Sequence, residues 1–335
     1  MKILFLSDYV STWNIGGATR ILLSQLKSCT KDGHDALLIS GGPPKDHGEM
    51  PCSWVKHTYK SLGFLPNLLA SIRKAKKDFQ PDLLHIHQPL IGLLASMVFH
   101  RGTPKVYHFH SLWKDEKMSH AKTLLGQLYS HLKGWIESFA LRRMDHFIVL
   151  SDFSRQKLLK AVPHANITVI PGAVDTGRFN NAVAQTTKEP EAGLEIVSVR
   201  RLDPRMGLDL LLKAVALFKE KYPEEKLTCT IIGEGRQRDE LENIITTLEL
   251  QESVHLKGRV EEDELVRAMT QAHLSILPTR ELEGFGVSVI ESFSAGTPVM
   301  ATSAGALSEF ERFPDVFHCV GDANPENLLN GLRWA

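Results

Sequence analysis

Cysteine is scarce in this chain of 335 residues, and its four thiols stand far apart. Their spacing matches no metal-binding motif, which fits free thiols in a reducing compartment. No apolar stretch approaches the roughly 20 residues of a membrane-spanning helix. The first apolar run is too short for a signal peptide and predicts a strand instead. These absences favour a cytoplasmic globular protein.

The chain also lacks net charge, but its charges are unevenly placed. Residues 1–170 contain 22 Lys and Arg against 12 Asp and Glu, a balance of +10, and the remainder therefore carries −10. Twelve of the 15 histidines also lie in the first half. A basic half favours an anionic partner such as a membrane surface, although solvated surface charge without a partner is the alternative. We expect no nucleic acid partner.

Two motifs of other ligand-binding proteins are missing as well. The turn after the first predicted strand contains Gly16 and Gly17 but no G-x-G-x-x-G fingerprint, which argues against a dinucleotide-binding domain. No Asp-x-Asp pair occurs in the sequence. The acidic run at 261–264 opens a predicted helix, where negative charge is favourable without a metal. We therefore expect no metal and no bound cofactor.

Apolar runs typical of strands alternate with helical patterns along the chain, which indicates parallel sheets covered by helices on both faces. The pattern occurs twice, with a polar interruption between. We predict two doubly wound α/β domains, at 1–178 and 194–335, joined by a linker at 179–193. Ligands bind beyond the carboxyl ends of such strands, so we expect the site in a cleft between the domains. The predicted strands are 3–7, 36–39, 83–86, 106–109, 147–150, 168–170, 195–199, 227–232, 254–256, 274–277 and 298–301.

The segment around Glu283 carries the most chemical information. A buried strand precedes it, a Gly-Phe-Gly turn at 284–286 follows it, and a helix is predicted at 287–295, with Glu291 about two turns in. Glycines at a helix N-terminus leave backbone N–H groups uncovered, and such an end binds phosphate. Carboxylates would repel that phosphate, so we expect the two glutamates to accept hydrogen bonds from hydroxyl groups. Hydroxyls flanking a diphosphate predict a nucleotide sugar.

Two His-x-His pairs lie at the ends of predicted strands: His85 with His87, and His108 with His110. Residues two apart in a strand share a face, so a zinc site is one interpretation. No Cys or carboxylate pair lies nearby to complete it, and we favour a role in the substrate cleft for at least one histidine. A hydrogen-bonded histidine at a strand end is the third alternative.

Arginines follow the strand predicted at 195–199. Arg200 and Arg201 come directly after it, and Arg205 and Gly207 precede the next predicted helix. A guanidinium group cannot lose its charge and binds a diphosphate with two donors. Such arginines are usually surface residues, but at the carboxyl edge of a sheet, opposite the Glu283 loop, they are candidates for binding the donor.

Taken together, these residues resemble glycosyltransferase family 4, a family of retaining enzymes with the GT-B fold. The family's two glutamates, separated by seven residues, correspond to Glu283 and Glu291. Its Arg-Leu loop, which ends in glycine, matches Arg201 to Gly207, and residues 169–179 look like its domain junction. The resemblance covers nearly the whole chain.

The resemblance implies that Glu291 holds the ribose hydroxyls and Glu283 those of the transferred sugar. His110 matches the family histidine beside the anomeric centre. Arg201 and the amides at 284–287 would bind the diphosphate. Gly16 and Gly17 would close on the diphosphate from the other domain, and Val260 would touch the base. The complete set of donor-binding positions that the resemblance implies is Gly16, Gly17, Arg201, Arg205, Val260, Glu283, Gly284, Phe285, Gly286, Val287 and Glu291.

The sequence departs from the family pattern in three places. The phosphate-binding lysine falls at Met206, so Arg205 is expected to supply that charge. The usual Asn-Gly of the junction is Gly172 and Ala173. Family members usually continue beyond the position of Ala335 into helices that pack on the N-terminal domain, so a truncated chain is an alternative that we weigh.

We therefore predict a metal-independent, retaining hexosyltransferase. Its donor would be a nucleotide-diphosphate sugar and its acceptor lipid-linked or a glycan, in bacterial surface polysaccharide or glycolipid synthesis. The alternatives are a sugar-nucleotide epimerase and a non-catalytic, nucleotide-sugar-binding subunit.

We further expect the basic N-terminal domain to lie on the inner face of an anionic membrane. Four basic residues cluster at 73–77. Apolar residues also recur at helical spacing, and packing in the core is their alternative role. They are Leu125, Leu128, Leu132, Trp135, Ile136 and Phe139.

Overall fold

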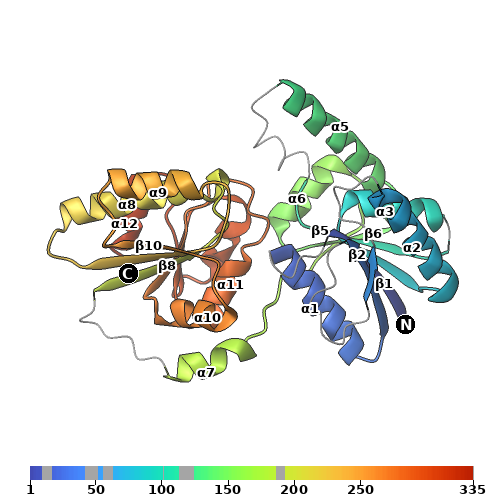
Figure 1. Ribbon diagram of the computed structural model, residues 1–335, viewed down its shortest axis with the longest axis horizontal. Coiled ribbons are helices and arrows are strands. Elements are labelled where there is room, and N and C mark those ends of the chain that lie inside the picture. The colour runs from blue at the N-terminus through green and yellow to red at the C-terminus, as the bar shows by residue number, and fades with distance from the viewer. Residues whose placement is uncertain are drawn as a thin grey trace. The chain divides into compact units, whose positions relative to one another are not determined.

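The computed structural model of the chain describes residues 1–9, 17–41, 52–55, 63–100, 102–112, 124–185 and 193–334. Its contacts divide the chain into two compact units, Met1–Gly172 and Ala173–Ala335. Each unit is built around one parallel sheet with helices on both faces (Figure 1). The predicted α/β class with two doubly wound sheets is therefore confirmed.

The first unit contains a seven-stranded sheet in the order β3-β2-β1-β4-β5-β6-β7, with parallel pairing throughout. Its strands are β1 (Lys2–Tyr9), β2 (Asp35–Gly41), β3 (Cys52–Val55), β4 (Leu83–Ile86), β5 (Lys105–Phe109), β6 (His146–Val149) and β7 (Ile167–Val169). Its described helices are α1 (Gly17–Lys31), α2 (Phe64–Asp78), α3 (Pro89–Val98), α5 (Leu124–Leu141) and α6 (Asp152–Ala161).

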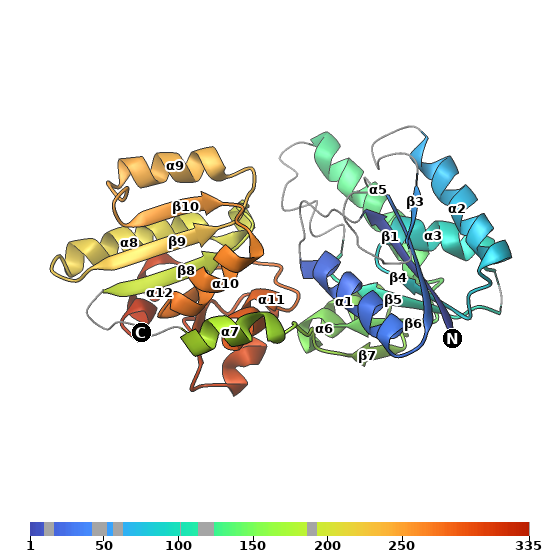
Figure 2. The same ribbon diagram turned by 60° about the horizontal axis from the view of Figure 1, so that its bottom comes forward.

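Alternation along β1 decides which helices cover which face of this sheet. Leu4 and Leu6 pack in a cluster with α2 and α3, whereas Ile3 and Phe5 pack with α1 on the opposite face. Figure 2 shows α1 on one side of this sheet and α2 and α3 on the other. Successive side chains of a strand point to opposite faces, so an uninterrupted apolar run buries both of them.

The second unit contains a six-stranded parallel sheet in the order β10-β9-β8-β11-β12-β13. Its strands are β8 (Leu194–Val199), β9 (Leu227–Ile232), β10 (Val254–Gly258), β11 (Leu274–Leu277), β12 (Val299–Ala301) and β13 (Phe317–Cys319). Its helices are α7 (Gly177–Gln185), α8 (Leu208–Lys221), α9 (Arg238–Thr247), α10 (Glu262–Gln271), α11 (Val287–Ser294) and α12 (Pro325–Leu332), with 3-10 turns η2 (Pro204–Met206) and η3 (Gly305–Arg312). Ile196 of β8 packs with α8, α9 and α12, and Val197 packs with α7 and α10 on the other face.

The structure differs from the sequence-based picture at the sheet edges and at the predicted linker. The edge strands β3 and β13, of four and three residues, were not predicted because such short runs carry little periodicity. Residues 179–185 of the predicted linker form most of α7, because Phe179 is fully buried in the second unit's core against α10. Across the described ranges, no helix has the length and apolar character needed to cross a bilayer.

Candidate functional site

The strand order of the second sheet brings two loops together at its carboxyl edge. Strand β8 lies between β9 and β11, so the chain winds away from β8 in one direction and later returns on its other side. Such a reversal leaves a crevice beyond the carboxyl ends of the two neighbouring strands, where doubly wound sheets bind ligands. The loop after β8 carries Arg200 and the loop after β11 carries Glu283.

Arg200 and Glu283 form an ion pair at this point. Nη2 of Arg200 lies 2.7 Å from Oε2 of Glu283, and the two side chains are 5% and 16% exposed. The same nitrogen donates to the hydroxyl of Thr279 and lies 3.1 Å from Sδ of Met206. Because water competes weakly at such burial, the arginine fixes the orientation of the carboxylate.

Backbone contacts hold both loops in place. The carbonyl oxygen of Glu283 accepts a hydrogen bond from Ala306 at 2.9 Å, and a Cβ on Gly305 would lie 2.2 Å from the same oxygen. A Cβ on Gly207 would lie 1.9 Å from the carbonyl oxygen of Pro278. Both glycines have positive φ, so glycine is required for conformation and for space.

Helix α11 begins directly after the Glu283 loop. Gly286 precedes its first turn with a φ of 94°, a conformation that favours glycine. Phe285 is buried and packs against Phe310 with ring centroids 5.7 Å apart, so only its backbone is available to a ligand. The amides at 284–287 therefore lie at a helix N-terminus, where N–H groups have no acceptors within the helix.

The helix begins at Val287, as predicted, but Glu291 lies about one turn into it rather than two, because it is only four positions after Val287. Its Oε1 lies 2.5 Å from Nη2 of Arg178, and the two side chains are 6% and 17% exposed. The other terminal nitrogen of Arg178 contacts Glu262 of α10. Arg178 thus ties three helices together and holds the second carboxylate of the site.

The remaining predicted donor-binding residues of this unit lie at the same edge of the sheet. Arg205, in η2, donates to the carbonyl oxygen of Leu282 at 3.1 Å, which brings its charge to the Glu283 loop. Arg201 is exposed beside Arg200. Val260 is partly buried just beyond β10, against the cluster that includes α7 and α10.

A further arginine stabilises this edge without having been predicted. Arg280 forms two hydrogen bonds with Asp209 of α8, at 2.6 and 2.7 Å. Burial acts to raise the pKa of Asp209, but the hydrogen bonds and charge of Arg280 outweigh it and lower the pKa below its ordinary value. Arg280 also donates to the carbonyl oxygen of Pro204, so it links the turn η2 to the loop after β11.

The first unit holds the other predicted residues. Gly17 is the first residue of α1, whereas Gly16 lies outside the described residues. His110 follows β5, and its Nε2 lies 3.0 Å from Nδ1 of His87. Burial lowers the pKa of His110 to about 4, so its ring is neutral at pH 7.

Sequence reasoning found the two glutamates but not the arginines that hold them. Arg200 was considered only as a companion of Arg201, and Arg178 only as part of the domain junction. The signal that could have identified Arg200 is its place directly after a fully apolar strand. Nothing in the sequence distinguishes Thr279.

Comparison with known proteins identifies the family of both units. Residues 15–178 match the family model Glycosyltransferase Family 4, and residues 181–335 match the model Glycosyl transferases group 1. The chain therefore belongs to glycosyltransferase group 1, family 4, and the family resemblance seen in the sequence is confirmed.

Two curated relatives show how far the similarity extends. A human subunit of phosphatidylinositol N-acetylglucosaminyltransferase is 28% identical over 261 residues, which make up 76% of this chain but 49% of that protein. Phosphatidyl-myo-inositol mannosyltransferase of Mycobacterium leprae (strain TN) is 27% identical over 274 residues, 81% of this chain and 68% of that protein. The match thus spans about half the length of the human relative.

Solved structures share the fold. Sucrose-phosphate synthase from Thermosynechococcus elongatus superposes with a TM-score of 0.82 at 19% identity, covering 99% of this chain and 89% of that one. Anabaena Alr3699/HepE in complex with UDP superposes with a TM-score of 0.77 at 20% identity, covering 100% and 89%. These likenesses establish the GT-B fold.

Proposed function

We propose that the chain is a retaining glycosyltransferase that moves a hexose from a nucleotide-diphosphate sugar to a lipid-linked or glycan acceptor. The observation that carries this proposal is a pair of carboxylates at the start of α11, the partly buried Glu283 and the buried Glu291, each held by an arginine. A carboxylate has about four acceptor positions, so one that bonds an arginine can still accept a substrate hydroxyl. Two such acceptors on either side of a helix N-terminus suit a diphosphate flanked by two sugars.

The diphosphate would lie at the N-terminus of α11. The helix dipole and the N–H groups of the first helical turn favour an anion there. Arg205 reaches the same loop, and the exposed Arg201 adds a second positive charge. In this arrangement Glu291 takes the ribose, Glu283 the hexose and Val260 the base, as the family resemblance implies.

Transfer passes through an oxocarbenium-like state while negative charge grows on the leaving diphosphate. Preorganised amides and arginines stabilise that charge, and the loss of one such donor costs about 3 kcal/mol by analogy with oxyanion holes. The departing phosphate accepts the acceptor's proton on the same face of the sugar, so no carboxylate is needed as a nucleophile. Neutral His110 is assigned beside the anomeric centre.

Helix α5 supports a lipid-linked acceptor at a membrane surface. Four of its apolar side chains face solvent rather than the core: Leu128, Leu132, Trp135 and Phe139, which are 67%, 55%, 69% and 42% exposed. Ile136 is partly buried, and the side chain of Leu125 lies outside the described residues. Arg143, on the same side, lies over the Phe139 ring at 3.5 Å. An exposed apolar stripe beside basic residues is typical of helices that lie in a membrane interface.

The names of the two curated relatives support the same acceptor class, since each name includes a phosphatidylinositol lipid. We propose that the chain acts from the cytoplasm, peripherally on the inner face of a membrane, in bacterial surface polysaccharide or glycolipid synthesis. One observation favours the non-catalytic alternative: buried Met206 stands where the family has a phosphate-binding lysine.

A thermal-shift screen against nucleotides and nucleotide sugars tests donor binding. A ligand at 100 times its Kd stabilises the folded chain by about 2.7 kcal/mol, so the matching donor should raise the Tm clearly. Glu291→Ala should abolish that rise, whereas Glu220→Ala, at an exposed position of α8, should keep it. A screen in which no nucleotide sugar raises the Tm would contradict the proposal.

A further inference from the structure

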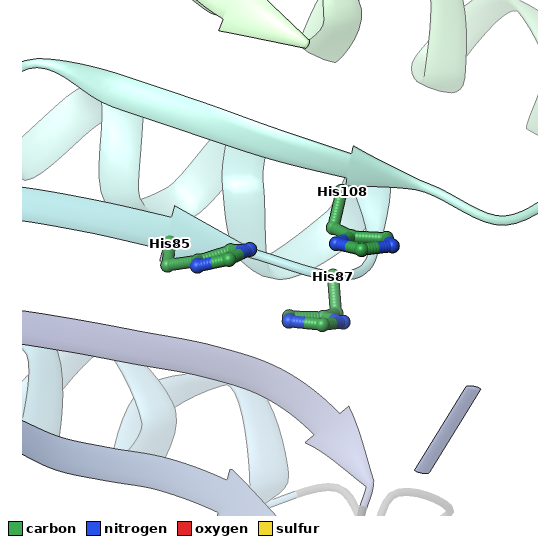
Figure 3. Close-up of side chains that lie close together, drawn as sticks. All are labelled: His85, His87 and His108. Atoms are coloured by element: carbon green, nitrogen blue, oxygen red, sulfur yellow. The ribbon is translucent and has the colours of Figure 1, made fainter. Parts of the chain in front are cut away.

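Three histidines gather on the face of the first sheet that α1 covers. His85 is on β4, His87 directly follows β4, and His108 is on β5 (Figure 3). Residues two apart in a strand share a face, and β4 pairs with β5, so the three imidazoles meet at the carboxyl edge of the sheet. They are 8%, 3% and 1% exposed.

Each of these histidines has a buried ring nitrogen without a partner among the described residues, namely Nε2. On two of the three rings the other nitrogen is hydrogen-bonded. Nδ1 of His87 lies 3.0 Å from Nε2 of His110, and Nδ1 of His108 lies 3.2 Å from Nε2 of Gln25. A buried polar atom without a hydrogen bond costs free energy, and three in one cluster require an explanation. Metal-ligating histidines show this division, with one nitrogen hydrogen-bonded and the other on the metal.

The spacing of the ring nitrogens suits a single ion after a small movement. One nitrogen from each histidine lies within 4.8 Å of those of the other two. In a tetrahedral zinc site with bonds of about 2.1 Å, ligand nitrogens are about 3.4 Å apart. The rings of His87 and His108 are stacked 5.1 Å apart at 7°, whereas a ligated imidazole holds the metal in its own plane. Binding of a metal ion by all three histidines must therefore turn at least one ring about χ2, which is a soft torsion in histidine.

We propose that His85, His87 and His108 bind one divalent transition-metal ion, with Zn²⁺ as the expected ion. Three imidazoles without a carboxylate suit zinc, copper or nickel better than magnesium or calcium. Water would complete the coordination, as in other three-histidine sites. The residues that define the donor site in the second unit take no part, so this site stands independently of the proposed function.

Metal binding would also fix the tautomer of the neighbouring His110. A metal on Nε2 of His87 leaves the ring proton on Nδ1, which then donates to Nε2 of His110. The tautomer and orientation of His110 would follow from the metal. This consequence alone rests on the role that we propose for His110 in transfer.

Metal content tests the site. Untagged wild-type chain is stripped with EDTA, dialysed against Zn²⁺, desalted and analysed by mass spectrometry, and we expect about one zinc per chain. His85→Gln, His87→Gln and His108→Gln should each weaken zinc binding by more than about tenfold. The control His164→Gln removes an exposed histidine from the same unit and should bind as wild type. Circular dichroism identifies any variant that fails to fold.

X-ray absorption of the zinc-loaded wild type requires no variant, and it should show three imidazole nitrogens at about 2.0–2.1 Å. A wild-type chain that retains no zinc would overturn the proposal. Buried water would then be the hydrogen-bond partner of the three Nε2 atoms. Folded variants that bind zinc as tightly as wild type, or a spectrum with fewer than three imidazoles, would also overturn it. Donor binding in the thermal-shift screen is a separate measurement, so either result can fail without the other.

Discussion

Arg200 and Glu283 lie 83 positions apart in the sequence and form an ion pair at 2.7 Å in the structure. They approach because β8 and β11, whose ends carry them, are neighbours in the sheet. The pair joins the two loops that the proposed donor site requires. The sheet order, rather than either loop alone, therefore determines the shape of the site.

Removing Arg200 should damage both stability and turnover. Arg200→Ala leaves the partly buried carboxylate of Glu283 without its cation. Because breaking a fully buried pair costs about 3 kcal/mol of unfolding free energy, we expect a loss of up to that size. Its neighbour is the matched control, because Arg201→Ala removes an exposed guanidinium and should weaken donor binding while leaving urea unfolding nearly unchanged. Equal stability losses in the two variants would contradict this assignment.

The two glutamates should differ in their kinetic effects. Glu291→Ala removes the predicted ribose contact and should raise KM or the donor Kd, whereas Glu283→Ala removes the contact to the transferred sugar and should mainly lower kcat. Glu262→Ala is the control, since it removes the other partner of Arg178 but no proposed donor contact. Small, equal effects of the first two substitutions on both constants would refute the division of roles.

Turnover should continue in excess EDTA, because arginines and helix amides rather than an Asp-x-Asp-bound ion are assigned to the diphosphate. The assay compares rates with EDTA alone and after addition of Mg²⁺, Mn²⁺ or Zn²⁺. Activity lost in EDTA and restored by Mg²⁺ or Mn²⁺ would show that the metal-independent mechanism is wrong. Restoration by Zn²⁺ alone would point to the histidine cluster instead.

The exposed face of α5 should bind anionic vesicles. We expect co-sedimentation that requires anionic lipid and fades with salt, because basic residues near such a surface contribute about 1 kcal/mol each. Trp135→Ser combined with Leu132→Ser should reduce binding, and Phe313→Ser, at an exposed aromatic residue of the second unit, should not.

The basic cluster of α2 provides a second arm of this experiment. Neutralising the exposed Arg73, Lys74 and Lys77 should weaken vesicle binding further. Lys76 is left unchanged, because it donates to the carbonyl oxygen of Val98 at 2.6 Å and its loss would disturb packing. Wild-type chain that remains in the supernatant with anionic vesicles at low salt would leave a soluble enzyme with a soluble acceptor.

The fold could be predicted where burial leaves a continuous signal. Each central strand is an apolar run because both of its faces are covered, as Leu4 and Phe5 of β1 show on opposite sides of the sheet. The edge strands β3 and β13 lack that signal. Helix α7 was missed because its sequence is polar, and its stability comes from the burial of Phe179 in tertiary contacts.

Only those parts of the site that are formed by residues close together in the sequence could be predicted. Glu283 and Glu291 are eight positions apart on one loop and one helix, so a local pattern reveals them. Their partners Arg200 and Arg178 lie 83 and 113 positions away, and only the folded sheet brings them close. The solvent exposure of the apolar stripe on α5 could not be predicted from the sequence either, since apolar residues at helical spacing are compatible with packing in a core and with contact to a membrane surface.

The central claim is retaining transfer from a nucleotide sugar, and NMR of the reaction tests it most directly. The chain is incubated with the donor that raises its Tm and with inositol-lipid and glycan acceptors, and the anomeric signals of donor and product are followed. We predict release of the nucleoside diphosphate, a product with the donor's anomeric configuration, and loss of both in Glu283→Ala. Binding without consumption, conversion of the donor to another nucleotide sugar, or an inverted product would contradict the account.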